Sequence, residues 1–344
     1  GEPCLAGGDP SACFFGEVAL DVGRDTEGQG GSALFAESVR AEQGVRFDGV
    51  HYRTSLDAAS AMLPEQTEVD ARFFPLFPQL PEVPTAEPGS DLSGKGGTND
   101  VPRNQTVCLP AGRHGSFRVQ RGATLRLSPA CGGGGAYELR DVQVDRDGAL
   151  FVESGVEVQM RDLQISRGGR AGFAKVEVHA RDVLADAGSE LLFREVVFHA
   201  RGLGLGKQAV ARFEGPGESS LFVVADALFF DQQSQLNVEN AAGTGPSPVV
   251  PGRVRIFVLG SDSGPAAPRH TVEIGPAAAV RANIMALPAP DELGGTITVG
   301  PQASVTGALF GEHVFVGSRA TIQRDNTLVG DGAIDPDYRD GDVD

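Results

Sequence analysis

Two histidines in the middle of the chain have a spacing that could bring a pair of metal ligands together. His179 and His199 stand 20 residues apart, each in a short run of alternating apolar residues. If the two runs are stacked strands, the imidazole rings lie about 5 Å apart, and imidazole nitrogen is a common zinc ligand. The equivalent place one repeat earlier is Gln159, so no third ligand recurs at this period. We therefore expect a plain side-chain ladder on one face rather than a metal site.

An Arg-Asp phrase recurs with almost the same period. Its arginines are separated by 21, 20 and 20 residues, and the phrase comprises Arg140, Arg161, Arg181 and Arg201 with Asp141, Asp162 and Asp182. Stacked arginines repel one another unless acidic neighbours lie between them. One functional hypothesis is a track for a polyanion such as an acidic polysaccharide. We favour a solvent-exposed corner of each coil, in which the charges compensate one another.

Four cysteines, Cys4, Cys13, Cys108 and Cys131, lack the CxxC spacing of a zinc site. The sequence predicts two disulfides, Cys4–Cys13 and Cys108–Cys131. The second pair is separated by 23 residues, close to one repeat, so stacking would put its Cα atoms about 5 Å apart, within disulfide reach. Paired cysteines indicate an oxidising compartment, hence the cell surface, the periplasm or the extracellular space after export. The alternative is four reduced thiols in a cytosolic protein.

The end of the chain carries aspartates at nearly alternate positions around Gly341. They are Asp335, Asp337, Asp340, Asp342 and Asp344. Calcium loops use aspartates in this way, with a glycine at the turn. The match to the twelve-residue calcium loop is incomplete, because no glutamate closes it and Pro336 interrupts it. We therefore expect a mobile acidic tail and no cofactor, with a calcium ion bound by these aspartates as the alternative.

The elements that would position these residues are stacked β-coils. A fixed period of about 20 residues, carried by short alternating runs, is typical of a β-solenoid. The 47 glycines and 22 prolines suit a chain that bends sharply between strands. The predicted fold class is all-β: a single-stranded parallel β-helix with about 20-residue coils and an irregular N-terminal part.

The chain divides into four regions by pattern and composition. Residues 1–73 are predicted to form irregular N-terminal coils and a cap, and residues 74–104 are a Pro/Gly-rich segment that packs along or links to the solenoid. The regular parallel β-helix covers residues 105–325, and residues 326–344 form the acidic C-terminal tail.

Two local elements are predicted within the first region. Residues 51–65 carry apolar side chains at helical spacing behind Thr54 and Ser55, either of which can cap a helix, so this segment is predicted to be a short helix. Residues 28–32 are glycine-rich and are predicted to form a flexible turn.

Charge and hydropathy exclude several partners. The net charge is −17, whereas binding to phosphate backbones needs a basic face, so no nucleic-acid partner is expected. No run approaches the roughly eighteen apolar residues of a membrane span, so no membrane insertion is expected. The chain begins at Gly1 without a methionine or an apolar signal segment. We expect a processed form whose export signal lay on the removed part.

The sequence has few of the features that polysaccharide-active enzymes need. Glycosidases need paired carboxylates about 5 to 9.5 Å apart, and sugar subsites favour aromatic platforms. The chain has no tryptophan and three tyrosines, and carboxylate pairs such as Asp226 with Asp231 are common in any acidic protein. No hydrolase or metalloprotease motif stands out. We expect a protein that is not an enzyme, with a polysaccharide-active lyase or glycosidase as the alternative.

Four stretches share one pattern of turns and strands: a proline-rich approach at 74–88, the phrases at 109–117 and 122–127, and a closing phrase at 305–322. On these stretches, most of residues 70–322 resembles the Gly/Ala-rich β-helical domain of bacterial cell-surface and pilus-assembly-associated proteins. His114 stands where that family often has tyrosine, and the cysteine pair is not part of its pattern. Bactofilins share the solenoid logic, but they are cytosolic, shorter and lack disulfides.

The resemblance implies export and a surface or appendage role, and it carries over no catalytic residues. We therefore expect a structural or adhesive component that can self-associate end to end into fibres, because terminal coils expose unpaired edges. The expected partners are copies of the same chain or other cell-surface and pilus components. A pilus-associated module is a further alternative.

Overall fold

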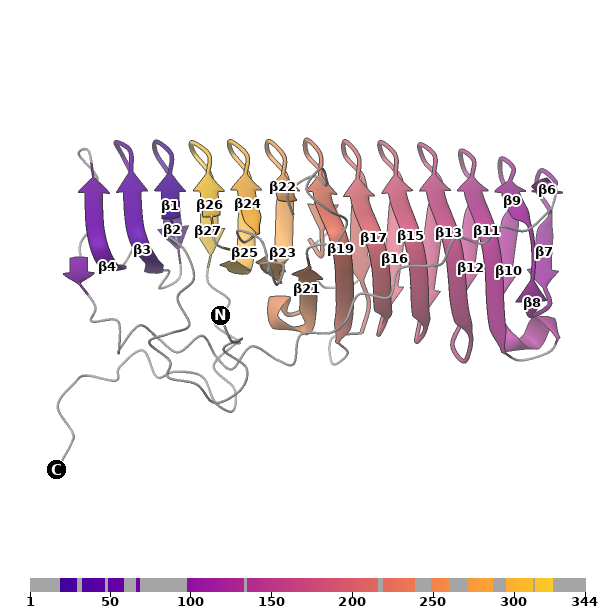
Figure 1. The fold of residues 1–344 in the computed structure, drawn as a ribbon. Helices are drawn as coiled ribbons and strands as arrows, with labels where there is room; N and C mark the ends of the chain where they lie inside the picture. The colour runs from indigo at the N-terminus through magenta and orange to yellow at the C-terminus, as the bar shows by residue number, and fades with distance from the viewer. Residues whose placement is uncertain are drawn as a thin grey trace, which may run out of the picture.

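The computed structural model describes residues 19–29, 33–46, 49–58, 66–68, 98–132, 135–215, 219–238, 249–259, 271–286, 295–311 and 313–323. These residues form one elongated stack of β-coils (Figure 1). All 27 strands pair side by side in parallel. The predicted fold class, a parallel β-solenoid, is thus confirmed. The described residues contain no helix whose length and apolar character would let it span a bilayer.

The strands follow three faces of the coil. The first face begins with β6 (Thr98–Val101) and β9 (Ser116–Val119), and later contains β22 (Thr271–Ile274), β24 (Thr296–Val299), β26 (His313–Val316) and β1 (Ala19–Val22). The second face contains β7 (Thr106–Leu109), β10 (Thr124–Leu127), β12 (Ala149–Val152), β14 (Arg170–Ala174), β16 (Glu190–Arg194), β18 (Val210–Phe213), β20 (Gln235–Leu236), β27 (Thr321–Gln323) and β2 (Glu27–Gln29). The third contains β8 (Gly112–Arg113), β21 (Val254–Val258) and β5 (Gln66–Glu68).

Longer strands bend from one face to the next. The strands that run from the third face into the first are β11 (Ala136–Val144), β13 (Glu157–Ile165), β15 (Glu177–Ala185), β17 (Val197–Leu205), β19 (Ser220–Phe230), β3 (Ala33–Ala41) and β4 (Gly49–Ala58). Those that run from the second face into the third are β23 (Ala279–Ala286) and β25 (Ser304–Phe310). The pairing of β11 with β13 skips Arg140, and that of β13 with β15 skips Arg161, so the Arg-Asp phrase marks the bend.

The core fills the inside of every coil because apolar residues alternate along the strands. In β13 the inward residues Val158, Met160, Leu163 and Ile165 are almost fully buried. In the middle of the stack the interior is aromatic, with the ring centroids of Phe193 5.0 Å from those of Phe222. Edge-to-face contacts of this kind add about 1 kcal/mol to the free energy gained by burying the rings.

A four-residue turn follows each strand of the first face except β4, after which the described residues stop, and it sets the pitch of the coil. Its third residue is left-handed, with φ from 55° to 82°, at Asp25, Gly44, Asn104, Gly122, Asp147, Gly168, Gly188, Gln208, Gln233, Ala277, Gln302 and Arg319. Most of these residues are not glycine, although the left-handed region favours it. Neighbouring turns are joined by backbone hydrogen bonds, such as that from Gln208 N to Gln232 O at 3.1 Å. The stacked turns therefore support one another.

The N-terminal strands do not precede β6 in space. They continue the stack beyond the last C-terminal strands, because β1 pairs with β26 and β2 pairs with β27 (Figure 1). Backbone bonds cross this junction from Gly23 N to Val316 O at 2.7 Å and from Arg319 N to Arg24 O at 2.8 Å. The first and last described parts of the chain therefore form one continuous ladder, an order that the sequence did not predict.

Two local predictions for the N-terminal region are wrong. Residues 51–58, expected to begin a helix, lie in strand β4, which pairs with β3 and β5. The predicted turn at 28–32 begins inside strand β2, where Gly28 pairs with Ile322. In both places the hydrogen bonds offered by neighbouring coils override the local propensity of the segment. The segments 59–65 and 30–32 lie outside the described residues.

Gly23, in the turn at the junction, allows the junction to be tested. A Cβ atom added at Gly23 would lie 2.9 Å from Ser318 N and from Val316 O, which are backbone atoms that cannot rotate away. We predict that Gly23→Ala lowers the free energy of unfolding by about 1–3 kcal/mol and speeds amide exchange in β1 and β2. Chemical denaturation and hydrogen exchange measure the two effects. Gly204→Ala is the control, since the one close contact of its Cβ, at 3.1 Å, would be the movable tip of Leu184; equal stabilities would contradict the predicted junction.

Candidate functional site

The outer side of the stack around β15 and β17 brings several polar side chains together. His179 and His199 are paired in register, so the strands place one ring directly above the other. The ring centroids are 4.8 Å apart and the rings are inclined by only 7°, as the repeat period predicted. Both side chains are only 10% exposed although they alternate with inward-facing residues.

A glutamate completes this group. Glu177 lies two residues before His179 in β15, and alternate residues of a strand share a face. Its Oε1 atom lies 3.3 Å from Nε2 of His179 and 3.9 Å from Nε2 of His199. The three side chains therefore hold one carboxylate and two imidazoles around one point, with all ligand atoms within 4.8 Å of one another. Such a set can share a proton or bind a metal ion.

The repeat period did not point to Glu177, because a period identifies ligands in neighbouring coils and Glu177 lies in the same strand as His179. The equivalent residue there, Gln159, is in register with His179 and donates from Nε2 to Glu157 Oε1 at 3.4 Å. The available signal was the Glu-x-His spacing within one predicted strand, which places both side chains on the same face.

The Arg-Asp phrase forms an interleaved ladder next to this group. Two arginines reach back to the aspartate of the preceding coil with two nitrogens each: Arg161 to Asp141 at 2.7 and 2.6 Å, and Arg181 to Asp162 at 3.0 and 2.8 Å. Arg201 bonds Asp182 in the same way. Bidentate pairing is the strongest arrangement of these groups. The predicted charge compensation is confirmed, and the carboxylates occupy the guanidinium edges that a polyanion would need.

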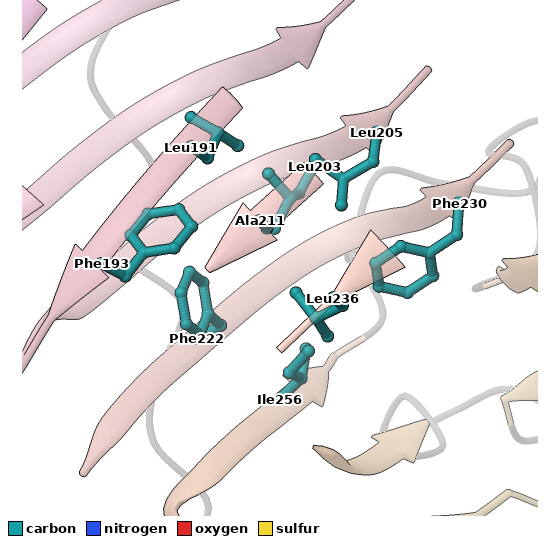
Figure 2. A pocket seen from close by; sticks show the side chains of 9 residues that line it. All are labelled: Leu191, Phe193, Leu203, Leu205, Ala211, Phe222, Phe230, Leu236 and Ile256. Atoms are coloured by element: carbon teal, nitrogen blue, oxygen red, sulfur yellow. The ribbon is translucent and has the colours of Figure 1, made fainter. Parts of the chain in front are cut away.

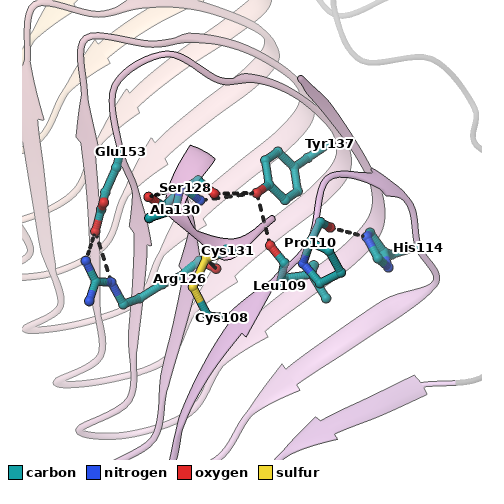
Figure 3. Close-up of a disulfide and its surroundings, with 10 residues drawn as sticks. All are labelled: Cys108, Leu109, Pro110, His114, Arg126, Ser128, Ala130, Cys131, Tyr137 and Glu153. Carbon is teal, nitrogen blue, oxygen red and sulfur yellow. Dashed lines mark hydrogen bonds and ion pairs between the residues drawn. A yellow bond between two sulfur atoms is a disulfide. The ribbon is translucent and has the colours of Figure 1, made fainter. Parts of the chain in front are cut away.

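A disulfide fastens the first coil to the second. Cys108 in β7 and Cys131, in a short 3-10 turn (Pro129–Cys131), are bonded with their Cα atoms 5.2 Å apart (Figure 3). Beside them the buried hydroxyl of Tyr137 lies 3.0 Å from the carbonyl oxygens of Leu109 and Ser128 and accepts from the Ser128 N–H at 3.2 Å. The end of the stack is therefore tied both covalently and by a buried polar network.

One carboxylate beside the disulfide has a perturbed acidity. Glu153 accepts from Arg126 Nε at 2.9 Å (Figure 3). Hydrogen bonds from Arg126, and then from Ser128, hold the pKa of Glu153 below its ordinary value of 4.5. Both side chains are well exposed, so this ion pair lies on the surface of the stack.

A small void lies inside the aromatic part of the core. Nine apolar side chains line it, among them Leu191, Phe193, Phe222 and Leu236 (Figure 2). Its volume of about 10 Å³ is room for the centre of one water molecule at most. It can therefore hold no substrate.

Several predicted site residues fall outside the described residues. They are Cys4, Cys13, Asp335, Asp337, Asp340, Asp342 and Asp344. The Cys4–Cys13 disulfide and the calcium site of the tail stay predictions, as does the packing of the proline-rich segment before Thr98.

Comparison with known proteins gives no relative: no protein-family model, no curated protein and no solved structure matches the chain.

The interleaved ladder can be tested by a double-mutant cycle. Asp162→Asn and Arg181→Gln each break one bidentate pair, and their coupling energy should be about 1 kcal/mol, near the upper end for partly exposed pairs. The coupling should fall at high salt because the pair is reached by solvent. Urea unfolding of the two single variants and the double variant measures it.

The exposed pair Arg146–Asp147, whose closest atoms lie 3.8 Å apart, is the matched control and should show almost no coupling. Equal coupling energies for the two pairs would contradict the ladder.

Proposed function

We propose that this chain is a non-enzymatic, exported β-solenoid that acts as a structural or adhesive component of a cell surface or extracellular assembly. The observation that carries the proposal is the unbroken coil-to-coil ladder, in which inward positions are used for packing. A continuous stack of this kind keeps the two ends of the molecule a fixed distance apart. On the outside, Arg161, Arg181 and Arg201 are already paired with aspartates of the preceding coils.

Two further observations support export. The Cys108–Cys131 disulfide joins the first two coils, and disulfides persist in oxidising compartments, whereas the cytosol keeps thiols reduced. The net charge of −17 favours solubility and mutual repulsion of side surfaces. Association by the ends is then favoured over association by the sides.

The ends of the stack offer the surfaces for such association. Among the residues that the structure describes, β6 pairs only with β9 at one end and β5 only with β4 at the other. An open strand edge is a template for pairing with another chain. Contact between two different ends does not close on itself, so it generates a filament. A second copy of this chain is the partner that both edges fit.

The proposal predicts filaments one solenoid wide. At high protein concentration, negative-stain electron microscopy should show unbranched fibres, and sedimentation should show assemblies that grow with concentration. Asn99, exposed on the end strand β6, gives the blocking variant: an Asn99→Lys charge on this edge should keep the protein monomeric.

Leu184→Lys, on the side of the stack where Leu184 is exposed, is the control and should leave the filaments intact. Wild-type protein that stays monomeric at every concentration would sink the end-to-end assembly. Protease treatment of intact source cells tests the location separately, since a surface protein is cleaved without lysis.

A further inference from the structure

We propose that Glu177, His179 and His199 form a binding site for a divalent transition-metal ion, with Zn²⁺ as the ion that suits the ligand set best. Two imidazole nitrogens and one carboxylate oxygen are ligands typical of zinc sites that keep a further position open for water. Borderline imidazole ligands disfavour Ca²⁺ and Mg²⁺, which prefer oxygen alone. The ion would join coils β15 and β17 on the outer side of the stack.

The distances come close to what such an ion needs. Ligand atoms about 2.1 Å from a tetrahedral zinc are about 3.4 Å from one another. Glu177 Oε1 and His179 Nε2 are already 3.3 Å apart, and Glu177 Oε1 and His199 Nε2 are 3.9 Å apart. The three ligand atoms span up to 4.8 Å, so the two rings must tilt toward each other for both nitrogens to reach one ion, while the ladder between β15 and β17 keeps the backbone in place.

The two rings are already close together before any ion binds. Their low exposure, 10% for each side chain, limits the rotamers open to them, so little conformational entropy is lost when they tilt toward an ion. Glu177 is 53% exposed, and it provides the side from which an ion can enter.

The local charge also favours a cation. Glu157 and Glu177 are directly in register on adjacent strands, and like charges opposite one another destabilise a sheet. The nearest arginine along β15, Arg181, is paired with Asp162 and Asp182 on the other side of the bend. A divalent ion beside Glu177 would relieve the repulsion between the two carboxylates.

Gln159 supplies a conservative way to remove each ligand. It occupies the same ladder position as the histidines one coil earlier, so glutamine fits the fold there. The test variants are therefore His179→Gln and His199→Gln. His313→Gln, on β26 and outside the cluster, is the matched control.

The experiment is titration of the metal-free, untagged full chain with zinc chloride, followed by calorimetry. The wild type and His313→Gln should bind one Zn²⁺ in this site, and each test variant should bind it at least about tenfold more weakly. Cobalt(II) used as a spectroscopic probe should give the visible bands of an imidazole-ligated ion, and these should be absent from the double variant.

Three results would overturn the proposal: no saturable zinc binding, equal binding by all variants, or a cobalt spectrum that does not depend on the two histidines. Equal binding would point to surface carboxylates or the acidic tail. Circular dichroism checks folding. If a histidine variant is unfolded, Glu177→Gln replaces it, since this exposed side chain can change without disturbing the core, and the same tenfold loss is expected.

Discussion

The parallel backbone pairing between consecutive coils is the constraint on which everything else in this protein depends. Because neighbouring strands lie about 4.8 Å apart and in register, a residue type that recurs once per coil becomes a column of side chains. Apolar columns fill the interior. Polar columns on the outside would stack like charges on one another. The protein avoids this by pairing charges with opposite charges of the neighbouring coil, as where Arg181 bonds Asp162 of the preceding coil.

The same pairing makes the spatial order of coils independent of their order in the chain. A coil can join the stack wherever its turn and strands match those of the coil beside it. The N-terminal segment matches the C-terminal coils in both respects. Gly275, Gly300, Gly317 and Gly23 occupy the first position of consecutive turns, and at each one the space of a Cβ atom is filled by backbone of a neighbouring turn. The glycine stack continues across the junction as though the chain had not been interrupted.

The repeat period alone predicted the solenoid, the closeness of Cys108 and Cys131, and the stacking of His179 on His199, because all three follow from the vertical spacing of coils. Two kinds of feature escaped it. Residues 51–58 have a local pattern typical of a helix. They form a strand because β3 pairs with them, and this pairing is not visible in the segment itself. Glu177 escaped because its relation to His179 lies along a strand and not between coils. The turn Gly23 to Thr26 starts with glycine, as the C-terminal turns do, and this was the available signal for the position of the N-terminal coils. It is missed when repeats are compared only with their neighbours in the chain.

The most direct measurement of the account is a cysteine pair across the junction. Asp21 and Phe315 are in register on β1 and β26, with Cα atoms expected about 5 Å apart, within disulfide reach. In Asp21→Cys with Phe315→Cys, mild oxidation should give a disulfide within one chain, seen by peptide mass spectrometry and as a monomer on a non-reducing gel. Asp21→Cys with Thr298→Cys, one coil out of register, should not close. Failure of the matched pair to cross-link, or equal cross-linking of both pairs, would contradict the continuous ladder.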